Sequence, residues 1–145
     1  MPANHIQLVA ACFAMVMLAF IVGSALLFTR VREMRQKRLH PQSIANSLLM
    51  AARLENVKVA DNFRNLFEVP VLFYALVAMA LATGFVPGWL VPGSWLFVAL
   101  RFAHSFIHCT YNRVYHRLAV FLTSFGLLVA MWVGYVVSLA SKAAG

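Results

Sequence analysis

The feature that most constrains the fold of this chain is a long apolar run from Ile6 to Phe28 that carries no charged residue. About 20 consecutive apolar residues are enough for an α-helix to cross the hydrocarbon core of a bilayer. The run is too long for the hydrophobic region of a signal peptide, and no Lys or Arg precedes it. We therefore expect an uncleaved first membrane span at about residues 6–28.

Three further apolar runs follow, at about Asn62 to Gly84, Ser94 to Asn112 and Arg117 to Leu139. Hydrophobic residues make up 63% of the chain and charged residues 11%, whereas a soluble domain has roughly 45–50% and about 25%. The link between the last two runs is short, so these two spans should form an antiparallel hairpin. We predict an all-α membrane protein, one domain over residues 1–145 that forms a four-transmembrane-helix bundle, with a kink at Pro70.

The basic residues show which side of the membrane each connection faces. Eight of the twelve Lys and Arg residues lie between the first two spans or at the start of the second span, and the connection between the second and third spans has none. The positive-inside rule then places both termini outside and the first and third connections in the cytoplasm. A net charge of +8 gathered in this way suits anionic lipid headgroups. We therefore expect contact with the lipid bilayer and no nucleic-acid partner.

The first connection contains a second pattern. Beyond Ser43, apolar residues recur at helical spacing, with polar residues between them. This pattern predicts a short amphipathic helix that lies at the membrane interface.

The fourth span carries a row of small residues every four positions: Gly126, Ala130, Gly134 and Ser138. Such rows let helices approach closely in lipid. The row predicts close packing, either within one subunit or between subunits.

The third span carries a stripe of polar side chains. Arg101, His104, His108, Tyr111 and Tyr115 are spaced 3, 4, 3 and 4 residues apart, which places them on one face of a helix. An arginine near the centre of the bilayer costs from about 3 to over 10 kcal/mol, so it must be paired or hydrated. The stripe must therefore face the inside of the bundle.

The second span supplies groups that can face this stripe. Glu68 is the one acidic residue within any predicted span, and Asn65 precedes it by three residues on the same helix face. Counted from the cytoplasmic ends of their spans, Glu68 and His108 lie at comparable depths. We predict a site for a polar, partly anionic ligand that opens to the cytoplasmic interface. The alternative is a polar seam that holds the bundle together. A metal bound by His104 and His108 would need a third ligand, and we predict no metal site.

Two segments resemble the MAPEG family, the membrane-associated proteins of eicosanoid and glutathione metabolism. The family pattern at the start of the second span is E-R-x-x-R-A-x-x-N-x-x-E, and within Ala60 to Tyr74 the residues Asn65 and Glu68 fall on its N-x-x-E. The segment from Arg101 to Leu118 is similar to the third and fourth spans of bacterial members. Val57, Asp61 and Asn62 depart from the pattern, and His104 and His108 stand where tyrosines are expected.

The resemblance implies a homotrimer in a bacterial inner membrane that binds glutathione, as substrate or cosubstrate, between subunits at the cytoplasmic side. It is compatible with a glutathione transferase or peroxidase that acts on apolar electrophiles. Arg117 is then the catalytic residue, because a nearby cation stabilises the thiolate. The implied ligand-binding residues are Arg64, Asn65, Glu68, Arg101, His104, His108, Tyr111, Asn112 and Arg113. Two alternatives remain open: a small proton-coupled transporter and a non-catalytic lipid-binding membrane protein.

Overall fold

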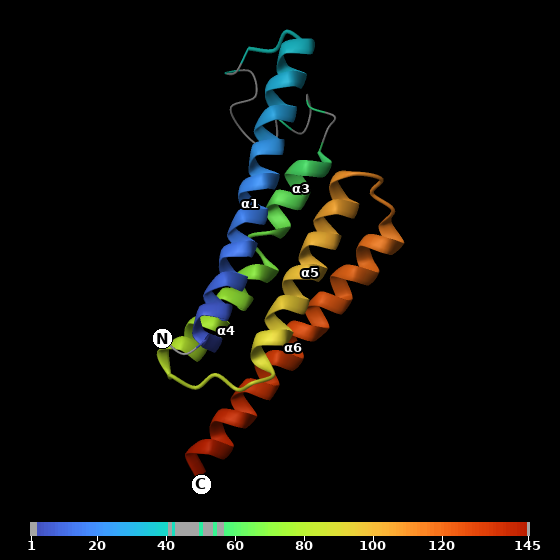
Figure 1. Ribbon diagram of the computed structural model, residues 1–145. Helices are drawn as coiled ribbons and strands as arrows, with labels where there is room; N and C mark the ends of the chain where they lie inside the picture. The colour runs from blue at the N-terminus through green and yellow to red at the C-terminus, as the bar shows by residue number, and fades with distance from the viewer. Residues whose placement is uncertain (1–2, 41, 43–49, 51–53, 55–56, 145) are drawn as a thin grey trace.

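The protein is a bundle of long helices (Figure 1). The computed structural model describes residues 3–40, 42, 50, 54 and 57–144. Its main helices are α1 (Ala3–Gln36), α3 (Lys58–Asn65), α4 (Val69–Ala82), α5 (Leu90–Cys109) and α6 (Val114–Ala144). Within these residues, α1, α3 with α4, α5 and α6 give four segments long and apolar enough to cross a membrane. The predicted four-helix membrane bundle is thus confirmed, whereas most of the predicted amphipathic helix after Ser43 lies outside the described residues.

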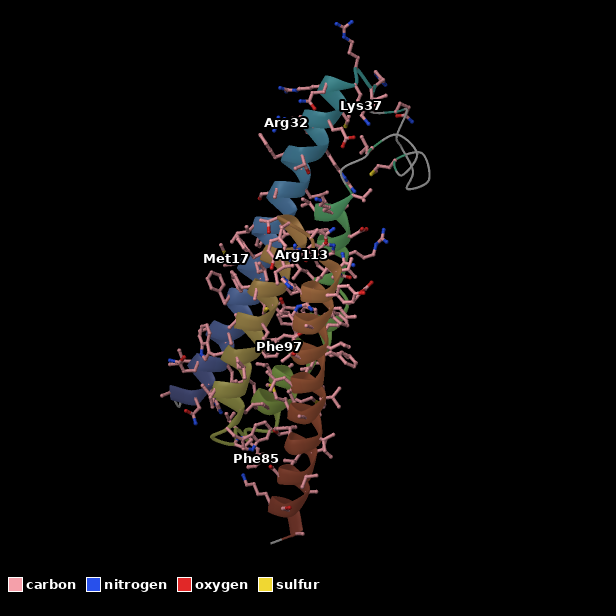
Figure 2. The ribbon with its side chains drawn as sticks, turned by 90° about the vertical axis from the view of Figure 1, so that its right-hand side faces the viewer. Met17, Arg32, Lys37, Phe85, Phe97 and Arg113 are labelled. Atoms are coloured by element: carbon pink, nitrogen blue, oxygen red, sulfur yellow. The ribbon has the colours of Figure 1, made fainter. Side chains whose placement is uncertain are left out.

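The two ends of the bundle differ in charge. At one end α1 finishes, α3 begins and residues 110–113 link α5 to α6. We call this the basic end, after Arg30, Arg32, Arg35, Lys37, Arg38 and Arg113. At the other end, which we call the loop end, residues 83–89 connect α4 to α5. Figure 2 shows Arg32 and Lys37 at one extremity of the molecule and Phe85 towards the other.

The helices pack around α5, which contacts α6, α1 and α3, while α4 contacts α1 and α6. Leu8, Met15 and Leu18 of α1 face inwards, and the rings of Phe73 and Phe97 stack at 4.8 Å. The outer faces of the helices are also apolar, as shown by Phe13, Phe20, Phe28 and Phe106, each more than half exposed. Helices that are apolar both inwards and outwards are expected when lipid replaces water as the solvent.

The second span is broken, and Pro70 explains where. Proline has no N–H to donate to the carbonyl of Leu66, and its ring collides with that carbonyl in a continuous helix. The helix accordingly stops at Asn65, Glu68 adopts a non-helical conformation with ψ −82°, and α4 begins at Val69. The predicted kink at Pro70 therefore takes the form of a three-residue interruption that separates α3 from α4.

Side-chain hydrogen bonds join α4 to α6 at the loop end and in the first turn of α4. The hydroxyl groups of Thr83 and Tyr135 lie 2.6 Å apart, and the Trp132 indole N–H donates to the carbonyl of Leu72 at 3.1 Å. The small-residue row of α6 takes part in this packing, because a Cβ on Gly134 would lie 3.2 Å from the Trp89 ring. Gly126 of the same row has open space beside it. The row thus packs within the subunit near the loop end and leaves a free face nearer the middle of α6.

Candidate ligand site at the basic end

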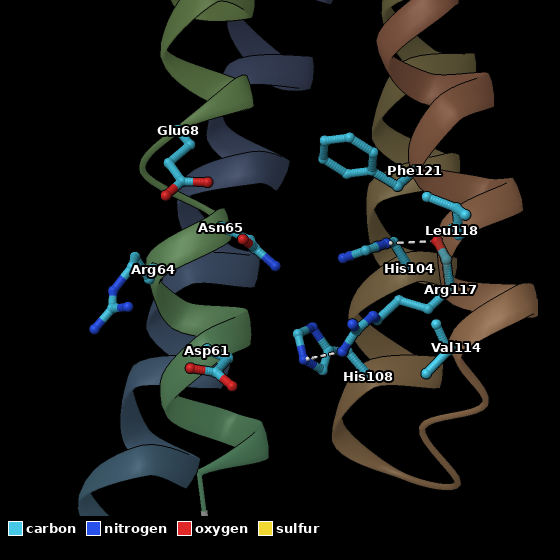
Figure 3. A pocket seen from close by; sticks show the side chains of 10 residues that line it. All are labelled: Asp61, Arg64, Asn65, Glu68, His104, His108, Val114, Arg117, Leu118 and Phe121. Atoms are coloured by element: carbon cyan, nitrogen blue, oxygen red, sulfur yellow. Dashed lines mark hydrogen bonds between the residues drawn. The ribbon is translucent and has the colours of Figure 1, made fainter. Parts of the chain in front are cut away.

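A cavity of about 420 Å³ lies at the basic end, between the α3–α4 pair on one side and α5 and α6 on the other (Figure 3). Its volume falls in the range of about 300–1,000 Å³ that is typical of small-molecule sites. The residues that line it are Asp61, Arg64, Asn65, Glu68, His104, His108, Val114, Arg117, Leu118 and Phe121.

One wall of the cavity comes from the broken second span. Asp61 and Asn65 are four residues apart on α3, and Glu68 follows in the interruption before α4. Figure 3 shows Asn65 pointing towards the opposite wall, whereas Arg64 is directed away from it. This wall therefore presents two carboxylates and an amide to a ligand, with a guanidinium at its rim.

The opposite wall is organised by Arg117, in the first turns of α6. Its Nη1 atom lies 2.9 Å from Nε2 of His108 and 3.1 Å from Oδ1 of Asn112. Its backbone carbonyl accepts a hydrogen bond from Nδ1 of His104 at 3.3 Å. Three residues from α5 and the link after it thus hold one residue of α6.

Arg101 is fully buried beneath this wall. Its Nη2 donates to the backbone carbonyl of Asn65 at 3.1 Å, and its guanidinium lies 6.0 Å from the centre of the Phe121 ring. Its Nε and Nη1 have no hydrogen-bond partner among the described residues, and the same holds for Nε2 of His104 and Nδ1 of His108. Buried polar atoms are nearly always paired. Two of these four nitrogens, Nε2 of His104 and Nδ1 of His108, belong to side chains that line the cavity, which indicates a site that a polar ligand completes.

Several predicted site residues lie outside the cavity. The hydroxyl group of Tyr111 lies 3.3 Å from Nδ1 of His116, and both side chains are exposed. Arg113 is also exposed, and Tyr115 is 86% exposed. Asn112 contacts Arg117 and is not among the lining residues. The structure thus brings together Asn65, Glu68, His104, His108 and Arg117, with Arg101 behind them and Arg64 at the rim.

The sequence analysis missed four lining residues: Asp61, Val114, Leu118 and Phe121. Helical spacing could have found three of them. Asp61 precedes Asn65 by one turn, and Val114 and Phe121 lie three residues before and four residues after Arg117.

Asn62 has a structural role that its sequence position did not reveal. Its side chain is fully buried, donates to Sγ of Cys109 at 3.3 Å and accepts from the hydroxyl group of Ser105 at 3.3 Å. These bonds join α3 to α5.

The site offers both signs of charge. The α3–α4 wall carries Asp61 and Glu68, and the opposite wall carries Arg117, with Arg101 close behind. Charge-assisted hydrogen bonds to such groups are strong and directional. In the described part of the chain, no three His, Cys, Asp or Glu side chains lie close enough to share a metal ion. The arrangement suits a small zwitterion that has carboxylates and an ammonium group.

Comparisons with known proteins gave one match. The sequence model described as the MAPEG family matches residues 7–137, a range that contains both walls of the cavity. The comparison with curated proteins gave no match, and neither did the comparison with solved structures.

Proposed function

Because this chain belongs to the MAPEG family, we propose that its cavity binds glutathione, or a closely related thiol, and presents the thiolate to apolar electrophiles that reach it from the bilayer. The observation that carries the proposal is the pair of unpartnered buried nitrogens, Nε2 of His104 and Nδ1 of His108, on the lining of a cavity of mixed charge. Buried donors and acceptors of this kind are costly unless a ligand satisfies them.

The functional groups of glutathione match those of the cavity. Its two carboxylates suit the positive charges of Arg64 at the rim and of Arg101, which is buried behind the lining residues. Its ammonium group suits Glu68 or Asp61. Its thiol then lies on the side of Arg117, whose positive charge stabilises a thiolate.

His104 provides a place for the thiol proton. A carbonyl oxygen can only accept, so Nδ1 of His104 donates to the carbonyl of Arg117 and Nε2 of the neutral ring is an acceptor. Nε2 is buried and has no partner among the described residues. In the proposed reaction the thiol proton passes to Nε2 and the sulfur attacks the electrophilic carbon. The bond from that carbon to the leaving group, or to the oxygen of an epoxide, breaks, and the departing atom takes the proton back from Nε2.

The proposal includes an assembly and a membrane orientation. Three subunits would place a neighbouring subunit against the open side of each cavity, and the free face at Gly126 of α6 is available for such a contact. The basic end would lie in the cytoplasm of a bacterial cell, in keeping with the positive-inside rule, where thiols remain reduced.

The test is a titration of the detergent-purified protein with glutathione, followed by the ultraviolet absorbance of the thiolate. We expect a thiolate signal at neutral pH that Arg117→Ala abolishes. Arg32→Ala removes an exposed arginine of α1 outside the cavity and serves as the matched control. S-methylglutathione should compete for the site without giving the signal. If glutathione neither binds nor forms a thiolate, the proposal is wrong.

A further inference from the structure

The hydrogen bonds of Arg117 determine which of its N–H groups can reach a ligand. A guanidinium has five N–H donors and no acceptor, and two of the five belong to Nη1. Nη1 lies 2.9 Å from Nε2 of His108 and 3.1 Å from Oδ1 of Asn112. Both protons of Nη1 are therefore engaged, and Nε and Nη2 remain for a ligand.

The same contact fixes the protonation of His108. Because Arg117 can only donate, Nε2 of His108 must be the acceptor, and the neutral ring must carry its proton on Nδ1. The His108 side chain is 2% exposed and lines the cavity, and its Nδ1 has no partner among the described residues. This ring thus supplies a free N–H donor beside the arginine.

Asn112 is held in place by an unusual backbone conformation. Its φ is +47°, in the left-handed region that asparagine and glycine tolerate better than other residues. Its backbone N–H donates to the carbonyl of Ile107 at 2.9 Å, which closes the end of α5. The side-chain amide is thereby fixed one turn beyond His108, within reach of the same guanidinium nitrogen.

We propose that His108 and Asn112 are positioning residues that anchor Nη1 of Arg117, so that Nε and Nη2 of Arg117, together with Nδ1–H of His108, converge on an anionic group of the ligand. In the family pattern a tyrosine is expected at position 108. A phenol has its acceptor and its donor on one oxygen, whereas the imidazole of His108 has them on two separate ring nitrogens. The identity of the anionic group rests on the proposed function, whereas the anchoring of Arg117 does not.

The anchor depends on a neutral His108. A proton on Nε2 would remove the acceptor and place two cations 2.9 Å apart. The titratable and charged groups that face this ring are Asp61 of α3, Arg101 and His104 of α5 and Arg117 of α6, with Arg64 and Glu68 on the cavity lining. Acidification through the titration of His108 should therefore release Arg117 and reduce thiolate binding.

The first experiment needs no ligand. Protein with isotope-labelled histidine is studied by nuclear magnetic resonance at neutral pH, and the His108 signals are assigned by their loss in His108→Gln. We expect the tautomer protonated on Nδ1, and a shift towards the other tautomer in Arg117→Ala. A wild-type His108 protonated on Nε2 would overturn the inference, because that nitrogen could not accept from Arg117.

The second experiment uses paired variants in the glutathione titration. His108→Gln and Asn112→Asp keep an acceptor and should bind within about threefold of the wild type, whereas His108→Phe and Asn112→Gly keep the backbone but lose the acceptor and should bind at least about tenfold more weakly. The acid limb of the wild-type pH profile should flatten in His108→Gln, because glutamine does not titrate.

The outcomes separate this inference from the proposed function. Equal losses in the Gln and Phe variants, or an unchanged acid limb in His108→Gln, would show a merely structural role and contradict the inference while glutathione binding stands. If the wild type binds no glutathione, the proposed function fails, and the tautomer of His108 decides the anchoring by itself.

Discussion

At the scale of single residues, Arg101 is the side chain whose burial is hardest to explain by folding alone. It is 0% exposed and donates to Asn65, while Nε and Nη1 have no partner among the described residues. A buried charge with unsatisfied donors weakens the empty protein, since its desolvation is incompletely compensated. This residue is therefore better explained by ligand binding than by stability.

The expected result for Arg101→Met follows from this. An apolar side chain of similar length should leave the unliganded protein as stable as the wild type or more stable, by up to about 4 kcal/mol. Glutathione should bind at least about tenfold more weakly, because the positive charge behind the cavity is lost. Thermal unfolding in detergent, with and without glutathione, measures both effects.

Phe97→Ala provides the contrasting control. It removes a fully buried ring from the core and should cost about 3–5 kcal/mol of stability without selective loss of binding. A destabilised Arg101→Met protein with an unchanged response to glutathione would show that Arg101 belongs to the scaffold.

Spacing alone predicted part of the site and then failed at a definite residue. The 3–4 spacing correctly places Arg101, His104 and His108 on one buried face of α5. The same spacing wrongly places Tyr111 on this face. Tyr111 lies beyond the helix, because α5 ends at Cys109 and the backbone turns at Thr110 and Asn112. A helical phase carries no information beyond the end of its helix.

At the scale of elements, the interruption between α3 and α4 sets the shape of one cavity wall. It lies between Asn65 and Val69, so it determines how Asp61 and Asn65 are oriented relative to Glu68 and α4. Because successive residues of a helix are rotated by about 100°, a continuous helix through this region would redirect the side chains on α3.

Pro70→Ala should therefore separate stability from binding. It restores an N–H donor for the carbonyl of Leu66 and lets α3 and α4 join into one continuous helix, in whose interior proline would be about 3 kcal/mol less favourable than alanine. We expect an equal or higher unfolding temperature and a loss of glutathione affinity of about tenfold or more. Pro92→Ala, in the first turn of α5 at the loop end, is the matched control and should change neither. Unchanged binding in Pro70→Ala would mean that the interruption does not shape the site.

The helix ends were less predictable than the apolar runs between them. Hydropathy identified residues 6–28, yet α1 continues to Gln36. Arginine, methionine, glutamate and glutamine are good helix formers, and Glu33 bonds Lys37 at 3.0 Å one turn further on. Hydropathy measures solubility in lipid, whereas helix length also depends on these local preferences.

At the scale of the whole molecule, the positive-inside rule predicts an orientation that labelling can test. In a chain whose Cys12 and Cys109 are replaced by alanine, Gly88→Cys places a thiol in the exposed connection at the loop end, and Arg113→Cys places one at the basic end. A membrane-impermeant maleimide added to intact cells should label position 88 and should reach position 113 after lysis. The reverse pattern would contradict the predicted orientation.

The proposed trimer makes a second prediction at this scale. Gly126→Leu adds bulk where the single chain has open space, so the fold should tolerate it. If this face of α6 contacts another subunit, native mass spectrometry should show a reduced trimer fraction. Val136→Leu, at an exposed apolar position on another face of α6, should leave the trimer unchanged. An intact trimer in Gly126→Leu would exclude this face from the subunit contact.

Hydrogen bonds join α4 to α6, whereas a cavity lies at the basic end of the bundle. Local unfolding should therefore be easier in some helices than in others. Side-chain bonds connect α4 to α6 through Thr83 with Tyr135 and Trp132 with Leu72, whereas the cavity separates α3 from α6. The free energy of local opening should thus be lowest at α3, where backbone amides would exchange with deuterium fastest. A bound ligand supplies the missing contact, so protection should rise in α3 and in the first turns of α6 and stay constant at the loop end. At a ligand concentration of 100 times Kd the stabilisation would reach about 2.7 kcal/mol, concentrated in one half of the molecule.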